Sequence, residues 1–253
     1  MDCPKRLERL TPLSGAKKLA FALLLFAPCC YSQTVSPVIV EYKVKAEGRI
    51  ALTNNTLTQM AVVVEPRSFS IAPDGNGRYR PLDPGIHVQL SSMSFRIDPG
   101  QTYYIFYKAK ADKLPAWFTL YSTFSSVQHT SGLDIRILLP HTVYIYPKRP
   151  LGQGNTVQVT HVSYSPVAKR IVCDLENNSS DLDRVQEVEI ISGGKSISAP
   201  GFPMLPGGRR RLEFAWNESG PPETIQFRLQ HSRLKLPIAL EDQKSLSTPG
   251  TTQ

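Results

Sequence analysis

Hydrophobic and polar residues alternate along most of the chain with a period of two. The clearest example is Gly132–Tyr146, where Leu133, Ile135, Ile137 and Leu139 alternate with Asp134, Arg136, Leu138 and Pro140. A period of two is typical of a β-strand with one apolar face. Because Pro147-Lys-Arg-Pro follows directly, this segment is predicted to be the last strand of a β-domain.

Short segments of the same kind precede it, separated by turn residues. No stretch has the 3.6-residue period of a long amphipathic helix. Strands this short and this closely spaced predict an antiparallel sandwich. One of them is predicted to close at Pro66. The predicted strands are 37–44, 48–55, 59–65, 68–71, 78–82, 86–90, 95–97, 102–108 and 117–124.

Segment 147–154 is dense in Pro and Gly and predicts a domain boundary. Seven further strands are predicted beyond it, at 156–164, 169–176, 185–191, 195–198, 209–216, 224–229 and 234–240. The chain is therefore predicted to be all-β, with two consecutive immunoglobulin-like antiparallel β-sandwich domains at 33–148 and 149–241. The polar segment 242–253 has no apolar pattern and is predicted to be a disordered tail.

The N-terminus has the order of a secretory signal peptide. Basic residues precede the apolar run Leu19–Ala27, and small and polar residues follow it, which predicts a leader at 1–32 that is removed on export. The run is too short to span a bilayer comfortably, so the mature chain is predicted to have no stable membrane insertion and to be soluble outside the cytoplasm. An uncleaved anchor is the less favoured alternative. The sequence leaves lipidation at Cys29 or Cys30 open.

Charge and cysteine content narrow the class of protein. Removing residues 1–32 from the 253 leaves 221 residues with a net charge of +5, since the leader holds five of the 29 basic and two of the 21 acidic residues. The basic residues are scattered except at Arg209–Arg211 and lack interleaved aromatics, so no nucleic-acid partner is predicted. Cys173 is the one cysteine after the leader, and its alternation with Ile171 and Leu175 predicts a small buried apolar side chain.

Residues that usually carry chemistry are scattered along the chain. The histidines, His87, His129, His141, His161 and His231, lack the spacing of metal ligands. The chain is predicted not to be an enzyme and to use no cofactor or metal. A catalytic site built from distant loops would need His and carboxylate residues clustered in space, and the sequence gives no sign of such a cluster. Asn54, Asn177, Asn178 and Asn217 fit the glycosylation tripeptide.

Several segments of the first domain together resemble the periplasmic pilus-assembly chaperones, the PapD-like group. Gly48-Arg-Ile-Ala-Leu-Thr-Asn54 is similar to the family's second strand, which ends in Asn, and Met93-Ser-Phe-Arg-Ile-Asp-Pro-Gly-Gln-Thr102 is similar to its apolar-Arg-apolar-x-Pro-Gly turn. Lys113-Leu-Pro115 resembles the approach to the sixth strand, and Leu133–Tyr146 resembles the seventh. In the second domain the resemblance is architectural, with Phe202–Gly208 as the nearest local likeness.

The resemblance implies a periplasmic chaperone that binds exported pilus or fimbrial subunits. In this family the chaperone lends its seventh strand to a subunit that lacks its own last strand, a form of β-augmentation. The partners implied are exported pilin-like subunits, with an outer-membrane usher as a further one. The implied partner-binding residues of the donor strand are Leu133, Ile135, Ile137 and Leu139.

The sequence also departs from the family pattern. Family members hold the subunit's C-terminal carboxylate with an Arg in the first strand and a Lys in the seventh. Here 37–40 has no Arg, and the Lys position falls near Val143 or Tyr144; Lys43 and Arg136 are basic but stand in other registers. Docking of that carboxylate is therefore expected to be weaker.

Two alternatives stay open. The donor-strand residues could pack inward on their own domain, as the last strand of any sandwich does. The chain could also be a structural or adhesive two-domain component of a surface appendage.

Overall fold

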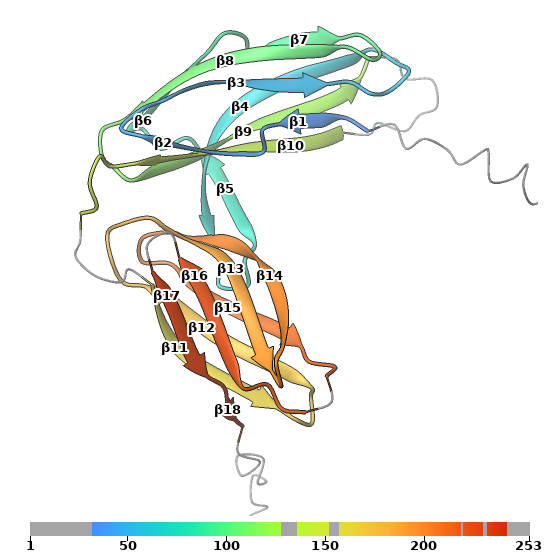
Figure 1. Cartoon of the computed structure of the whole chain (residues 1–253). Helices are drawn as coiled ribbons and strands as arrows, with labels where there is room; N and C mark the ends of the chain where they lie inside the picture. The colour runs from blue at the N-terminus through green and yellow to red at the C-terminus, as the bar shows by residue number, and fades with distance from the viewer. Residues whose placement is uncertain (1–31, 128–135, 152–156, 219, 230–231, 242–253) are drawn as a thin grey trace, which may run out of the picture. The chain divides into compact units, whose positions relative to one another are not determined.

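The computed structural model describes residues 32–127, 136–151, 157–218, 220–229 and 232–241, and these ranges contain strands and no helix (Figure 1). The strands form four sheets, which make two sandwiches. The predicted all-β fold with two consecutive immunoglobulin-like sandwiches is confirmed. Residues 1–31 of the predicted leader and the whole predicted tail lie outside the described residues. The boundary at 148/149 stays a prediction and falls between the last strand of the first sandwich and the first strand of the second.

Ten strands build the first sandwich. One sheet has the order β1-β3-β8-β6, and the other has the order β2-β10-β9-β4-β5, with β7 also paired to β4. The strands are β1 Thr34–Ser36, β2 Ile39–Lys43, β3 Ala46–Thr53, β4 Met60–Ile71, β5 Gly77–Pro81, β6 Ile86–Leu90, β7 Ser94–Ile97, β8 Thr102–Ala111, β9 Ala116–Ser126 and β10 Arg136–Tyr146.

Eight strands build the second sandwich, in sheets of order β15-β12-β11-β18 and β14-β13-β16-β17. They are β11 Val157–Ser165, β12 Arg170–Asn177, β13 Asp183–Ser192, β14 Lys195–Met204, β15 Arg209–Ala215, β16 Thr224–Leu229, β17 Arg233–Pro237 and β18 Ala239–Leu240.

Each sandwich closes over its own apolar core, because alternate residues of its strands point inward. In the first sandwich Ile50, Ile105 and Phe118 are completely buried, and in the second Ile171 and Phe227 are. Cys173 is also completely buried in the second core, as its position predicts, and burial raises the pKa of its thiol to about 12.

The first predicted strand, 37–44, is β2, and a further short strand, β1, precedes it in the other sheet. β1, which the sequence does not predict, pairs with β3, whereas β2 pairs in parallel with β10. The chain changes sheets at Pro37, which lies between β1 and β2. The N-terminal segment therefore joins the two sheets and covers part of the edge of β10.

The prediction that a strand ends at Pro66 is wrong, because β4 continues through it to Ile71. The backbone N of Val64 donates to the carbonyl of Met93. The backbone N–H and C=O groups of the even-numbered residues in this part of β4 therefore point to the side that β7 and β5 occupy. On that side the pairing with β7 ends at Val63 and the pairing with β5 begins at Arg67. Pro66 lies between the two partners, where its missing N–H removes no ladder bond.

Two further bounds in the second sandwich differ from the prediction. β14 runs to Met204 rather than Ser198, although it contains Pro200 and Pro203, because it is an edge strand. Gly201 lies in it where a Cβ would collide with the backbone of Val185 and Gln186. The predicted strand 234–240 is divided into β17 and β18, which belong to different sheets.

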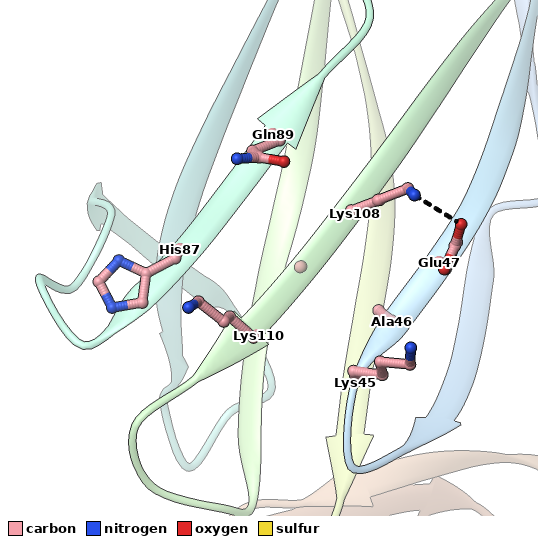
Figure 2. A pocket seen from close by; sticks show the side chains of 8 residues that line it. Lys45, Ala46, Glu47, His87, Gln89, Lys108 and Lys110 are labelled. Carbon is pink, nitrogen blue, oxygen red and sulfur yellow. Dashed lines mark ion pairs between the residues drawn. The ribbon is translucent and has the colours of Figure 1, made fainter.

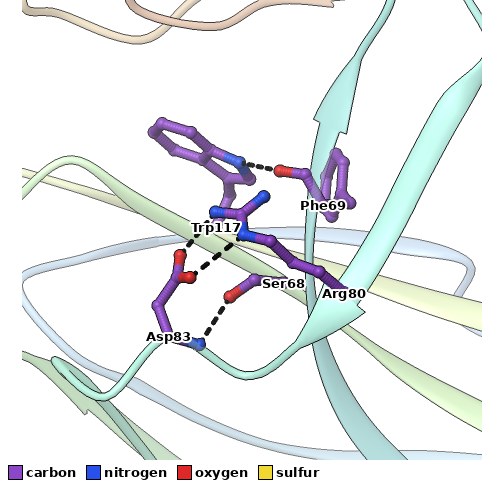
Figure 3. Close-up of polar contacts among 5 residues, drawn as sticks. All are labelled: Ser68, Phe69, Arg80, Asp83 and Trp117. Atoms are coloured by element: carbon purple, nitrogen blue, oxygen red, sulfur yellow. Dashed lines mark hydrogen bonds and ion pairs between the residues drawn. The ribbon is translucent and has the colours of Figure 1, made fainter.

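The β4–β5 hairpin is fixed to its sandwich by polar contacts (Figure 3). The indole Nε1 of Trp117 donates to the carbonyl of Phe69 at 2.8 Å. The buried hydroxyl of Ser68 accepts from the backbone N of Asp83 at 2.9 Å, and Arg80 holds the Asp83 carboxylate through two bonds of 2.7 and 3.1 Å. These bonds tie the hairpin to β9 and to the segment that follows β5.

Asn54 ends β3 with a completely buried side chain. Its amide group donates to the carbonyls of Thr58 at 2.8 Å and Ile97 at 3.0 Å. Its Oδ1 accepts from both the backbone N and the hydroxyl of Thr56, at 3.1 and 2.6 Å. The tripeptide match at this position therefore serves a buried turn, and both amide hydrogens are used inside the protein.

Asn177 occupies the same position in the second sandwich, at the end of β12, and is also completely buried. Its amide donates to the carbonyls of Asp181 at 2.8 Å and Met204 at 2.9 Å. Its Oδ1 accepts from the backbone N and the hydroxyl of Ser179 at 3.1 and 2.7 Å. The two sandwiches thus end an inner strand with the same arrangement of an asparagine and a hydroxyl residue two positions on.

Candidate partner-binding strand

β10 is the strand that the sequence predicts to bind a partner. It pairs antiparallel with β9 over Arg136–Ile145, but β2 pairs with it only over Thr142–Tyr146. Over the preceding residues, Arg136–His141, no strand within the described residues pairs with β10 on the side where β2 lies. The first half of β10 is therefore an edge strand (Figure 1).

The direction of the backbone groups follows from one hydrogen bond. The backbone N of Thr142 donates to the carbonyl of Val38, on the side of β2, at 2.7 Å. In a strand, residues two apart direct their backbone N–H and C=O to the same side. Pro140 and Leu138 therefore face the open edge. Pro140 has no N–H to present there, which agrees with its place on an edge strand.

The inner face of β10 carries the odd-numbered residues. Val143 and Ile145 are completely buried, whereas Ile137 and Leu139 are partly buried and pack against the first core. Their side chains therefore line the less enclosed end of the sandwich. On the outer face Leu138 is 55% exposed. Leu133 and Ile135, the other two predicted partner-binding residues, lie outside the described residues.

The two residues to which the resemblance assigns the family's anchoring Lys, Val143 and Tyr144, carry no charge. Val143 lies in the core, and Tyr144 is buried beside Phe69 with ring centroids 6.3 Å apart. Burial raises the pKa of the Tyr144 hydroxyl to about 12, so this group stays neutral. Lys43 and Arg136 are basic and exposed, but they stand at other positions of β2 and β10.

A buried hydrogen-bond chain, which the sequence does not predict, crosses the sandwich where β2 begins to cover β10. His141 is completely buried, and its Nδ1 donates to the carbonyl of Pro37 at 2.6 Å. Its Nε2 accepts from the hydroxyl of Tyr107 at 3.0 Å, and that oxygen lies 3.0 Å from the hydroxyl of Tyr42. The neutral ring with its proton on Nδ1 satisfies every bond, and the chain links β10, β8 and β2.

The buried hydrogen bonds of His141 predict that the protein loses stability in mild acid. Burial lowers the pKa of His141 from 6.5, and the bond to Pro37 opposes that shift. The unfolded chain binds a proton near pH 6.5 and the folded chain only at lower pH, so the stabilisation is complete above pH 6.5 and is lost as the pH falls toward the folded pKa. The slope contributed by this one proton is at most about 1.4 kcal/mol per pH unit.

Urea unfolding of the mature chain at several values between about pH 7 and pH 5 measures this slope. His141→Gln removes the titrating group, so its free energy of unfolding is expected to vary less with pH over this interval. His87→Gln, which changes an exposed histidine, is the matched control and should keep the slope of the original chain. Equal slopes for the original chain and His141→Gln would contradict the assignment.

Other kinds of site receive no support from the described residues. No group of three or more His, Cys, Asp or Glu is placed to hold a metal ion in these ranges. In the same part of the chain no helix is long and apolar enough to cross a membrane.

Comparison with solved structures places this geometry in a known fold. The YadV chaperone aligns with a TM-score of 0.51 and 12% identity, over 81% of this chain and 99% of that one. A chain in the complex of the Salmonella enterica SafA pilin with the SafB chaperone aligns with a TM-score of 0.50 and 13% identity, over 84% and 99%. No protein-family model and no curated protein matches the sequence. The protein therefore has the two-sandwich fold of the pilus chaperones, and the resemblance stated from the sequence is confirmed as a likeness of fold.

Proposed function

We propose that this protein is a periplasmic chaperone for exported pilin-like subunits and that it binds them by adding the first half of β10 and the segment before it to the subunit's sheet. The observation that carries the proposal is the length of β10 beyond β2, which leaves one edge of this strand without a strand partner among the described residues. The fold supports the proposal, since the SafB chaperone that shares it is in complex with a pilin. An outer-membrane usher would be the further partner.

The open edge would supply the backbone part of the binding. The backbone groups of Leu138 and the carbonyl of Pro140 face that edge, where an added strand could bond to them. The aliphatic row of Leu133, Ile135, Ile137 and Leu139 would supply the side-chain part. Ile137 and Leu139 are already half buried, so each would gain about 1 kcal/mol rather than the roughly 1.5–3 kcal/mol of a fully exposed residue.

The absence of basic residues at the anchoring positions gives the donor strand a larger share of the binding. Val143 and Tyr144 offer no charge to a terminal carboxylate, so the subunit would be held through the strand and its apolar row. Complex formation should accordingly depend weakly on ionic strength, because apolar contacts are not screened by salt.

Co-expression with a pilin-like subunit that lacks its last strand tests the proposal. The subunit should be degraded or insoluble by itself, and should be recovered from the periplasm as a one-to-one complex with this protein. A peptide that supplies the missing strand in cis should make the subunit independent of the chaperone. Recovery of the subunit without this protein, or failure to form a complex with any such subunit encoded beside its gene, would contradict the proposal.

A further inference from the structure

Two large aromatic side chains stand exposed on the outer face of β8. Phe106 is 58% exposed and Tyr104 is 49% exposed, whereas the inward-facing Ile105 and Tyr107 between and beside them are buried. β3 pairs with β8 beside both rings, whereas β6 pairs only with Tyr107–Ala111, so the rings lie on the solvent face just past the end of β6. Single exposed apolar residues are common, but two aromatics side by side on one sheet face form a patch that marks an interaction surface.

Basic residues lie beside the two rings and farther along the same face of β8. Arg49 is opposite Phe106 in the register of β3 and β8, and its guanidinium carbon is 5.3 Å from the centre of the Tyr104 ring. Farther along β8 come Lys108, which pairs with Glu47 at 3.1 Å, and Lys110. Together these residues form the aromatic–basic face: Arg49, Tyr104, Phe106, Lys108 and Lys110.

The basic end of this face is hollowed. A depression of about 330 Å³ is lined by Lys45, Ala46, Glu47, His87, Gln89, Lys108, Ala109 and Lys110 (Figure 2). Three lysines face one carboxylate there, and His87 is 3.2 Å from Asp112 at its margin. The hollow therefore has a surplus of positive charge and fits an acidic side chain.

We propose that the aromatic–basic face binds an acidic protein segment, which places an apolar side chain on Phe106 and carboxylates against Lys108 and Lys110. Tyrosine, phenylalanine and arginine together are characteristic of protein interfaces, and the lysines select an acidic partner by charge. Single-stranded nucleic acid is disfavoured, because stacking needs successive open rings and Arg49 lies over the ring of Tyr104. This surface lies on the other sheet from β10, so the inference does not depend on the proposed function.

The probe for this site is the peptide acetyl-Glu-Asp-Leu-Glu-Asp-amide, titrated into isotopically labelled mature chain and followed by NMR. The resonances of Tyr104, Phe106 and Lys110 should shift together, and the affinity should fall several-fold when salt is raised, because the carboxylate–lysine attraction is screened. The same peptide with Gly in place of Leu should bind about fivefold more weakly, since it offers Phe106 no apolar side chain.

Phe106→Ser and Lys110→Glu should each weaken binding of the peptide by about tenfold or more. The matched controls are Val167→Ser and Lys235→Glu, which change exposed residues of the second sandwich and should leave the affinity unchanged. All four side chains point to solvent, so thermal unfolding should show the same fold in each variant.

Four results would overturn the proposal. They are the absence of shifts on this face, equal binding of acetyl-Lys-Arg-Leu-Lys-Arg-amide, tighter binding of oligothymidine at the same residues, and self-association of the chain that Phe106→Ser abolishes. The third would indicate a nucleic-acid surface, and the fourth would indicate that a second copy covers the rings.

Discussion

Ile137→Asp is expected to abolish co-purification of a pilin-like subunit. If β10 completes the subunit's sandwich, the side chain at position 137 enters an apolar groove, and a carboxylate there loses its hydration without gaining a partner. Burying such a group costs several kcal/mol, so the affinity should fall by more than about a hundredfold. The measurement is the amount of subunit recovered with the tagged mature chain from the periplasm, quantified against the original chain.

The control must separate binding from folding, because Ile137 also packs against the core of its own sandwich. Val63→Asp places the same charge at a 43% exposed valine on the outer face of β4 and should leave recovery of the subunit unchanged. Ile137→Val keeps an apolar side chain and should retain binding. Thermal unfolding of each variant shows whether the fold survives. Normal recovery with a folded Ile137→Asp chain would exclude donation of this row.

The predictable part of the fold is the part that depends on local alternation. Segment 86–90, for example, carries apolar residues at Ile86, Val88 and Leu90, and the structure makes it β6. Alternation identifies a strand because it fits one buried and one exposed face. The pattern therefore sufficed for the approximate place of most strands and for the two-sandwich class.

The missed features depend on neighbours that are distant in the sequence. Pro66 looks like the end of a strand, but whether its lost N–H matters depends on which strand lies beside it, and there β7 and β5 leave a gap. Pro200 and Pro203 are likewise accepted because β14 lies at the edge of its sheet. Sheet order is not a local property of the chain, so these bounds could not be read from alternation.

The candidate site also combines features that local alternation predicts with features that depend on residues distant in the sequence. Alternation identifies Ile137 and Leu139 as one face of β10, and the structure places them on the inner face. It cannot indicate that β2 covers only Thr142–Tyr146, which is what leaves the edge open. His141 looks like an isolated histidine in the sequence, because its partners Pro37 and Tyr107 come from distant strands.

Asn177→Ala is expected to lower the free energy of unfolding of the second sandwich by about 2–5 kcal/mol, because it leaves the buried carbonyls of Asp181 and Met204 without their donor. Asn54→Ala should do the same to the first sandwich, through the carbonyls of Thr58 and Ile97. Asn178→Ala changes the exposed neighbour and should alter the stability by less than about 0.5 kcal/mol.

Denaturant unfolding of the mature chain, followed by the fluorescence of Trp117 in the first sandwich and Trp216 in the second, measures both effects. If the two sandwiches unfold independently, Asn54→Ala should shift the transition reported by Trp117 and Asn177→Ala the one reported by Trp216. Single-tryptophan variants separate the two signals. A shift of less than about 1 kcal/mol for both alanine variants would contradict the role assigned to the buried amides. A coincident shift of both transitions would instead show that the sandwiches unfold as one cooperative unit, with the asparagines stabilising the whole.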